Sequence, residues 1–509
     1  MPQRPLSKNK SQDIEDREDL DYARIIDVHR WSNFKEVNEF VDRIYEVLVK
    51  PDTEHDATKW KKHLKIVLLD LYVAWIDDPK LNIAVHMAND DYTNGSVFTG
   101  VKSRYNELFI SKTITKVIRR LDTLGYICRK AGYPSDQWKG KLTKIWARDS
   151  LIQQFESAMF SYFDMGYSEE RLTVIIRDKD KKDKEYKPSP CIKDMEKVLK
   201  SYNALLNKTF IDVPTLDKPY FEVQEKRTKK IRKVPISHHM KFTYRVFNEG
   251  SLKYGGRFYG GWWQRISQDN REKIYLNDKP TVEIDYKSLH PVLAYAKVGI
   301  DYNAEIEEDP YAVQINWIKD EKMRRGAVKL LFLLALNAKK ENTLFNAFRR
   351  DFEYSKYPLR VKFTNDKLKE MLEAIKEKHP KIAHLIATGA GLELMNIDSK
   401  MAEFVIKDFI STDSPILCIH DSFIVEFGED KRLERVMAEA FRAVADASSS
   451  VSIDNPLTTK RLDAVTEYKY STGFDRDYYL DNLKDFKPVV RSKGYKERLA
   501  RHKKHFTRK

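Results

Sequence analysis

Two short apolar runs, separated only by the sequence His-Asp-Ser, make up residues 415–427 (PILCIHDSFIVEF). Each run has the length of one β-strand, and a short polar turn between two such runs is typical of a β-hairpin. The hairpin would present Asp421 at its tip. An ionised aspartate beside so many apolar residues is costly unless a cation or hydrogen bonds compensate its charge. This segment therefore predicts an antiparallel sheet that carries a carboxylate at one edge.

A second strand with an aspartate near its end is predicted in residues 281–296 (TVEIDYKSLHPVLAYA). The pattern of Thr281, Val282 and Ile284 indicates a strand that delivers Asp285, and a helix is expected to begin near Leu289. Two aspartates on adjacent strands would repel each other, and a divalent metal ion is the usual remedy. We therefore expect Asp285 and Asp421 to share divalent cations.

Residues 321–342 (EKMRRGAVKLLFLLALNAKKEN), between these two segments, predict a helix with two cations on one face. Arg325 and Lys329 are four residues apart, so their side chains lie on the same side of the helix. Opposite a pair of metal-binding carboxylates, such cations suit the β- and γ-phosphates of a nucleoside triphosphate. The three segments together predict in-line phosphoryl transfer.

The size and charge of the chain agree with an enzyme that acts on phosphate-rich partners. A chain of 509 residues that is 41% hydrophobic can bury several cores, so two or three domains are expected. The formal net charge of +15 favours a nucleic-acid partner. Many basic proteins are merely soluble, so the charge supports this hypothesis only beside the motifs.

In the N-terminal half, a helix, a glycine stop and a hairpin follow one another and resemble a winged helix-turn-helix. Apolar residues recur at Ile114, Val117, Leu121 and Leu124, the helix stops at Gly125, and two β-like runs follow. The resemblance implies DNA contacts from the helix, and from a wing between the two runs. The helix candidates are Lys112, Lys116, Arg119 and Arg120, and the wing candidates are Arg129, Lys130, Lys139 and Lys141. The alternative is an amphipathic helix with a solvated basic face.

The three chemistry-bearing segments resemble motifs A, B and C of the superfamily of family A DNA polymerases and phage-type single-subunit RNA polymerases. The matching residues are Asp285 and Tyr286 in motif A, Arg325 and Lys329 in motif B, and His420 and Asp421 in motif C. Their order and spacing agree with that superfamily. The resemblance implies an α+β fold: a mainly helical N-terminal region with the winged-helix-like module, then a right-hand palm with an antiparallel sheet, and helical fingers.

The resemblance also implies roles for individual residues. Asp285, Asp421 and Lys329 would be catalytic, and two Mg²⁺ ions, or Mn²⁺ in their place, would bind Asp285, Asp421 and the backbone carbonyl of Tyr286. The expected nucleotide-binding residues are Arg325, Lys329, His290 and Asn337. The segment YGGRFYGGWWQRI resembles the Gly-Arg segment that family members place against template and primer, which makes Arg257, Gln264 and Arg265 candidate nucleic-acid contacts. His420 receives a positioning role beside the nucleic acid.

Departures from the family pattern leave the choice between dNTPs and NTPs open. His290 stands where the DNA polymerases carry a glutamate that acts as a steric gate against the ribose 2′-hydroxyl. A bulky gate favours deoxynucleotides, and SLHP resembles the SLYP of family B enzymes. Motif C, however, reads HDSF, which is closer to the RNA polymerases. Asn337 stands in place of the motif B tyrosine. It lies in LNAKKE, which resembles the AYGSKE of the RNA polymerases.

Simpler structural explanations exist for several of these residues. Asp285 could cap a helix, and Asp421 could serve only the hairpin turn. Lys329 could extend its apolar stem along a core helix. The aromatic cluster of Phe258, Tyr259, Trp262 and Trp263 is expected in the core rather than on a base-stacking surface.

The expected organisation has five parts. They are an N-terminal extension (1–55), a winged helix-turn-helix-like domain (56–175), a helical linker or thumb-like region (176–250), the polymerase palm and fingers (251–470), and a flexible basic C-terminal tail (471–509). Three cysteines far apart in the sequence indicate neither disulfides nor a zinc site. The longest apolar run, 330–336, is too short to span a bilayer, so a soluble cytoplasmic protein is expected.

These observations predict a template-dependent nucleotidyltransferase, specifically a DNA-directed DNA polymerase that replicates DNA, such as that of a mobile element. Its partners would be a DNA template and primer, nucleoside triphosphates and other replication proteins, with no membrane. One alternative is a single-subunit RNA polymerase or primase, and another is a non-catalytic DNA-binding replication factor.

Overall fold

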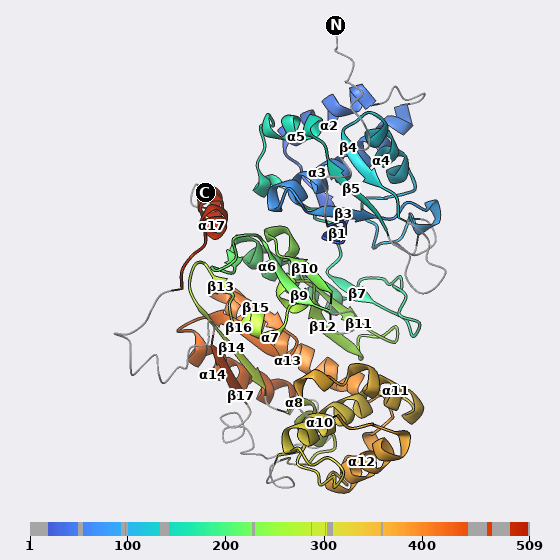
Figure 1. Ribbon diagram of the computed structural model, residues 1–509, viewed down its shortest axis with the longest axis vertical. Helices are drawn as coiled ribbons and strands as arrows, with labels where there is room; N and C mark the ends of the chain where they lie inside the picture. Colours follow the sequence, from blue (N-terminus) through green and yellow to red (C-terminus); the bar gives the residue numbers. More distant parts are fainter. Residues whose placement is uncertain are drawn as a thin grey trace.

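The computed structural model describes residues 19–48, 54–92, 97, 100–132, 142–225, 230–286, 288–300, 302, 309–357, 360–445, 466–470 and 489–506. Its helices and strands confirm the α+β class. Two hydrophobic cores divide the chain, one formed by residues 22–165 and the other by residues 174–445. The predicted boundaries after residues 55 and 250 do not coincide with this division. Figure 1 shows the N-terminal region at one end of the molecule and a group of helices at the other.

The N-terminal region is a four-stranded sheet with helices packed beside it. Its strands are β1 (Ala23–Ile25), β3 (Asn82–Val85), β5 (Thr143–Ala147) and β4 (Ile127–Lys130), in that spatial order, and β1 alone is parallel to its neighbour. The helices are α2 (Lys35–Leu48), α3 (Glu54–Asp77), α4 (Thr113–Thr123) and α5 (Asp149–Glu156). A small antiparallel pair joins β2 (Arg30–Trp31) to β6 (Gly166–Tyr167).

Helix α4 and the hairpin that follows it confirm the predicted order of elements. Ile114, Val117 and Leu121 are fully buried, because the apolar periodicity puts them on one face of the helix. The chain leaves the helix through Gly125, whose φ of +76° is a left-handed conformation that glycine adopts without strain. Lys139 and Lys141, predicted for the wing, lie outside the described residues.

Residues 176–250 are only partly helical, unlike the predicted helical linker. Helix α6 (Pro190–Lys208) begins at Ser189, whose side chain accepts a hydrogen bond from the Ile192 backbone. The remainder forms strands, since alternating runs such as YFEVQ favour extended backbone. These strands are β7 (Val174–Ile176), β8 (Ile211–Asp212), β9 (Tyr220–Gln224), β10 (Ile231–Pro235) and β11 (Tyr244–Phe247). The strand β12 (Gly255–Tyr259) pairs with β11.

The central element of the second core is a four-stranded antiparallel sheet. Its spatial order is β15 (Ile416–Ile419), β16 (Ser422–Glu426), β14 (Thr281–Tyr286) and β17 (Thr466–Tyr470). The helices α8 (Leu289–Lys297), α13 (Gly391–Ser411) and α14 (Asp430–Ala445) pack around it. The short elements α7 (Gln268–Arg271), β13 (Tyr275–Leu276) and the 3₁₀ helix η4 (Trp262–Arg265) lead into β14. As predicted, Phe258, Trp262 and Trp263 are buried, while Tyr259 is half-buried.

A helical part completes the end of the molecule opposite the N-terminal region (Figure 1). It consists of α10 (Glu321–Asn337), α11 (Glu341–Asp351) and α12 (Asn365–Lys378). Asp320 caps α10 by accepting a hydrogen bond from the Met323 backbone. No helix among the described residues combines the length and the apolar composition needed to cross a membrane.

The C-terminal segment differs from the predicted flexible tail. Residues 493–506 form helix α17 (Lys493–Phe506), which is docked on the rest of the chain. Arg498 forms a bidentate ion pair with Asp212 at 2.7 and 3.0 Å. Tyr495 is buried and donates a hydrogen bond to Asp278. The basic composition of this segment predicted a solvated arm. The partners that hold it in place, Asp212 and Asp278, lie more than 200 residues away in the sequence.

Candidate active site

The central sheet brings the two predicted aspartates to one edge. In the antiparallel register of β14 and β16, Asp285 lies directly opposite Ser422. Opposed residues in such a pair have Cα atoms about 4.5–5.5 Å apart. Asp421 immediately precedes Ser422, in the two-residue turn that joins β15 to β16. Both aspartates are half-buried. A hairpin turn and a neighbouring strand end therefore hold the two aspartates at adjacent backbone positions.

The turn itself has a specific backbone conformation. His420 has a φ of +61°, while Asp421 is not among the left-handed residues. A left-handed first residue is typical of the type II′ hairpin turn, where glycine is usual. A histidine in this conformation is under strain, and such strain often accompanies functional sites. The hairpin therefore fixes Asp421 at some cost in stability.

His420 is a neutral side chain in this turn. Burial lowers its pKa, and the charge of Arg257 lowers the pKa further, so the imidazole is neutral at pH 7. Its ring packs edge-on against Tyr259, with centroids 5.4 Å apart. The buried Nδ1 atom has no hydrogen-bond partner among the described residues. These contacts suit the predicted positioning role.

The two aspartates fit a magnesium site that relies on substrate for part of its coordination. No cluster of three or more His, Cys, Asp or Glu side chains in the described part of the chain could hold a metal by itself. Mg²⁺ commonly binds through one or two carboxylates, several waters and the phosphates of a substrate. The Tyr286 hydroxyl is already engaged, because it donates to the Met437 carbonyl in α14 at 2.5 Å. Only the backbone of Tyr286 is available for the predicted role.

A buried ionic network lies beside the hairpin and includes a residue that the motifs did not predict. Asp398, in α13, is almost completely buried and accepts hydrogen bonds from Arg257, at 3.0 Å for Nε to Oδ2. His290 Nε2 lies 3.0 Å from Asp398 Oδ2 and 2.9 Å from Arg257 Nη2. Burial opposes ionisation of Asp398, but the hydrogen bond from His290 and the charge of Arg257 hold the pKa of this carboxyl below its ordinary value.

This network gives Arg257 and His290 structural partners within the protein. The Arg257 side chain is 13% exposed, so it is largely committed to Asp398. Tyr259, two residues after Arg257, packs on His420, so the network adjoins the hairpin tip. The available signal for Asp398 was its place between the apolar residues Leu394, Ile397, Met401 and Val405 of one helix, because a charge buried among such residues requires a partner.

The two cations of α10 share contact with one tyrosine, Tyr311. Arg325 and Lys329 both lie over the ring of Tyr311, at 5.4 and 5.7 Å from its centroid. Burial raises the pKa of Tyr311 to about 12, a hydrogen bond with Ser288 opposes the shift, and the charge of Asp421 adds to it. Tyr311 therefore has the cations on one side and lies within electrostatic reach of Asp421. Both cations are exposed, and Arg325 also pairs with Asp309.

The other predicted site residues fall into different surroundings. Asn337, at the end of α10, donates to the Leu333 carbonyl at 2.7 Å and packs against Gly391. The side-chain amide of Gln264 donates to the carbonyls of Phe258 and Cys418 and accepts from Gly260. Gln264 therefore joins η4 to β15. Arg265, its neighbour, is exposed.

The predicted DNA-contacting cations of α4 belong to the N-terminal region, away from the central sheet (Figure 1). Lys112, Lys116, Arg119 and Arg120 are all exposed. Arg120 Nε also donates to the Leu48 carbonyl at 2.8 Å, which ties the end of α2 to this helix. The structure thus separates the candidate residues into a central group and an N-terminal group.

The sequence matches no protein-family model, and no curated protein matches it.

Proposed function

We propose that the chain is a template-dependent nucleotidyltransferase, most specifically a DNA-directed DNA polymerase. The observation that carries this proposal is the β14–β16 register, which puts Asp285 opposite Ser422 and next to Asp421. One carboxylate near the end of a strand and another in the neighbouring hairpin turn match the arrangement needed for two divalent cations at a phosphoryl-transfer site. The antiparallel sheet and the adjoining helices α10–α12 support the palm and fingers that the motifs imply.

Each protein group has a role in this proposal. Mg²⁺ or Mn²⁺ bound by the two aspartates would supply Lewis acidity to the α-phosphate and the primer 3′-oxygen. Lys329 and Arg325 would bind the β- and γ-phosphates, since both cations project from one exposed face of α10. His420 would hold Asp421 in place through the constrained turn. Arg257 and His290 would keep the buried Asp398 ionised beneath the site.

The N-terminal region supports a second nucleic-acid contact. A helix at residues 113–123 followed by the β4–β5 hairpin, with β3 beside β5, has the element order of a winged helix. Its four exposed cations would then meet DNA phosphates, and such contacts fix orientation rather than sequence. We propose that this region binds the template-bearing DNA.

A primer-extension assay with Mg²⁺ tests the polymerase proposal. Asp285→Asn and Asp421→Asn should each lower nucleotide incorporation by about a thousandfold or more, because each removes one ligand charge from the metals. Asp413→Asn is the matched control, since that aspartate is 69% exposed in its side chain. Activity within tenfold of the unmodified chain in either site variant contradicts the proposal.

The second candidate is an RNA polymerase or primase, and one observation favours it. The predicted gate residue His290 is hydrogen-bonded to Asp398 and buried, rather than free to stand against a ribose. The decisive measurement is extension of a primed DNA template with dNTPs and NTPs offered separately. A clear preference for NTPs replaces the DNA polymerase assignment with this one.

A further inference from the structure

A cleft lies where the N-terminal region meets the second core, and we call it the junction cleft. It has a volume of about 570 Å³, and its lining includes residues 23–30 and 232–235 together with Tyr167, Arg171, Tyr244 and Arg265. The size falls in the range of sites that hold small molecules or a short stretch of polymer. The cleft belongs to neither the α4 surface nor the central aspartate site.

The lining of the junction cleft is strongly cationic. Its charged residues are Arg24, Arg30, Arg171, Arg232, Lys233 and Arg265, against one carboxylate, Asp27. Arg24 is neutralised by Asp70 at 2.7 Å, and Lys233 lies 3.2 Å from Asp19. Arg232 and Arg265 are exposed, and neither has an ion pair within the described parts of the chain. The surplus charge therefore favours an anionic ligand.

One cation in the cleft is buried and incompletely satisfied. Arg30 is 1% exposed, yet its Nε and Nη1 atoms have no hydrogen-bond partner among the described residues. Its contacts with Asp27 and Asp70 are both 3.5 Å long. Arg30 therefore adds positive charge to the lining of the cleft, while its buried nitrogen atoms are not accessible to a ligand in this structure.

Aromatic side chains accompany these cations. Tyr244, which is half-buried, lines the cleft together with Tyr167 and Phe242. Arg171 already covers the last two rings, at 4.3 and 3.8 Å from their centroids. Tyr244 remains as the ring against which a base could stack. A basic groove with a stacking ring is typical of single-strand binding, because bases in a duplex cannot reach such a ring.

The floor of the cleft is connected to the candidate active site. Gln264, next to Arg265, donates to the Cys418 carbonyl in β15 at 2.9 Å. At the other end of the same segment, the Tyr259 ring packs on His420 beside Asp421. A single-stranded nucleic acid lying along residues 259–265 would pass from the cleft toward Asp285 and Asp421.

We propose that the junction cleft binds a single-stranded nucleic acid and leads it to the candidate active site. Phosphates contact Arg232 and Arg265, and a base stacks on Tyr244. The direction of the strand rests on the proposed function, whereas the binding can be measured without catalysis.

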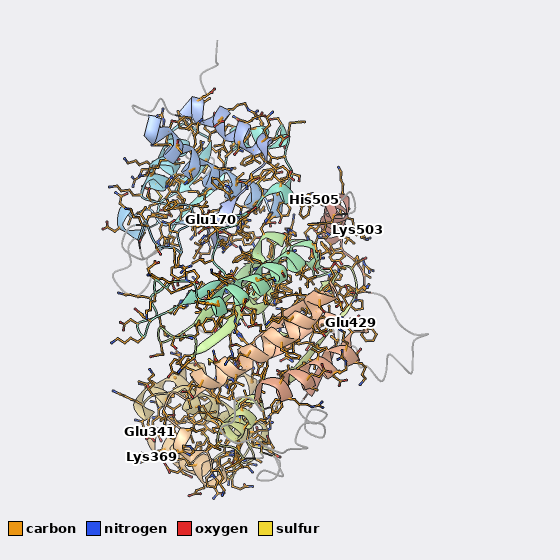
Figure 2. All side chains as sticks on the ribbon, turned by 180° about the vertical axis from the view of Figure 1, so that it is seen from behind. Glu170, Glu341, Lys369, Glu429, Lys503 and His505 are labelled. Carbon is orange, nitrogen blue, oxygen red and sulfur yellow. The ribbon has the colours of Figure 1, made fainter. Side chains whose placement is uncertain are left out.

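Fluorescence anisotropy with a labelled single-stranded oligodeoxynucleotide tests this inference on the full chain. The double variant Arg232→Ala/Arg265→Ala should weaken binding about tenfold at moderate salt. It should also reduce the magnitude of the slope of log K against log[salt] by about 1.4, since each of the two lost single-strand phosphate contacts contributes about 0.7. Lys369→Ala/Lys431→Ala is the matched control, which removes two exposed lysines from α12 and α14. Figure 2 shows Lys369 at the end of the molecule opposite the N-terminal region. Circular dichroism confirms that all variants are folded.

Three results would overturn the inference. They are an affinity of the cleft variant within twofold of the unmodified chain, an equal loss in the control variant, and equal competition by polyglutamate, which would indicate a general polyanion surface. Tyr244→Leu should weaken binding without changing the salt slope, and an unchanged affinity in that variant refutes the stacking contact.

The same measurements separate this inference from the proposed function. Asp285→Asn should bind the oligonucleotide normally while losing incorporation. If the unmodified chain binds through the cleft but incorporates no nucleotide, the polymerase proposal fails and the cleft stands. If it incorporates nucleotide but the cleft variant binds normally, only the cleft assignment fails.

Discussion

At the scale of single residues, Asp398 shows how much one buried charge determines. Replacing it by asparagine leaves the Arg257 guanidinium, which is 13% exposed, without its counter-charge. We expect Asp398→Asn to lower the free energy of unfolding by about 3–5 kcal/mol, the usual cost of breaking a buried ion pair. Asp351→Asn removes an exposed pair with Arg350 and should leave the free energy of unfolding almost unchanged. Urea denaturation measures both, and equal losses would contradict the buried role of Asp398.

The left-handed conformation of His420 gives a second prediction at this scale. Asparagine tolerates a φ near +61°, whereas a β-branched side chain does not. We therefore expect His420→Val to be less stable than His420→Asn by about 1–3 kcal/mol. Thermal unfolding of the two variants compares them, and indistinguishable midpoints would show that the turn is not constrained.

At the scale of one element, α10 should separate stability from nucleotide binding. Lys329 is exposed on this helix, so Lys329→Ala should change the free energy of unfolding by no more than about 0.5 kcal/mol. Under the proposed function it should nevertheless lower nucleotide incorporation by about a hundredfold, because a phosphate loses its cation. Lys340→Ala is the control and should retain activity, because Lys340 lies just beyond the C-terminal end of α10. Equal activity in the two variants removes Lys329 from the site.

At the scale of the whole molecule, α17 connects the N-terminal region to the second core. Phe163 stacks on His505 with centroids 4.9 Å apart and packs edge-on against His502, and Arg498 of the same helix pairs with Asp212. Figure 2 shows Lys503 and His505 beside the N-terminal region. One docked helix thus contacts both cores.

This junction should be sensitive to acid. Burial and the charge of Lys241 lower the pKa of His502 to about 3, from an ordinary value of 6.5, and burial also lowers the pKa of His238. Both histidines are therefore neutral when folded and gain protons on unfolding. Their contribution to stability is complete above about pH 6.5 and decreases as pH falls toward 3, by at most about 1.4 kcal/mol per pH unit for each histidine. Thermal unfolding at pH 7.5 and 5.5 measures the loss, and His502→Gln should reduce it. An identical pH dependence in that variant would exclude His502.

Local features of the sequence determined the secondary structure of the candidate site. The strand before Asp285, the hairpin around Asp421 and the helix carrying Lys329 were all predicted, because apolar periodicity and turn composition act over a few residues. Helix α4 and its glycine stop were predicted for the same reason.

Only the tertiary structure decided which distant residues meet. Asp398 lies 141 residues from Arg257 in the sequence, and their pairing depends on how α13 packs against β12. The docking of α17, the strands that replace the expected thumb helices, and the junction cleft depend likewise on packing between remote segments. Sequence pattern therefore predicted the local elements and singled out Asp285 and Asp421 as candidates. Long-range packing decided which buried charges pair, as it does for Asp398 and Arg257. The physical reason is that a charge removed from water needs a counter-charge, which the fold can bring from any part of the chain.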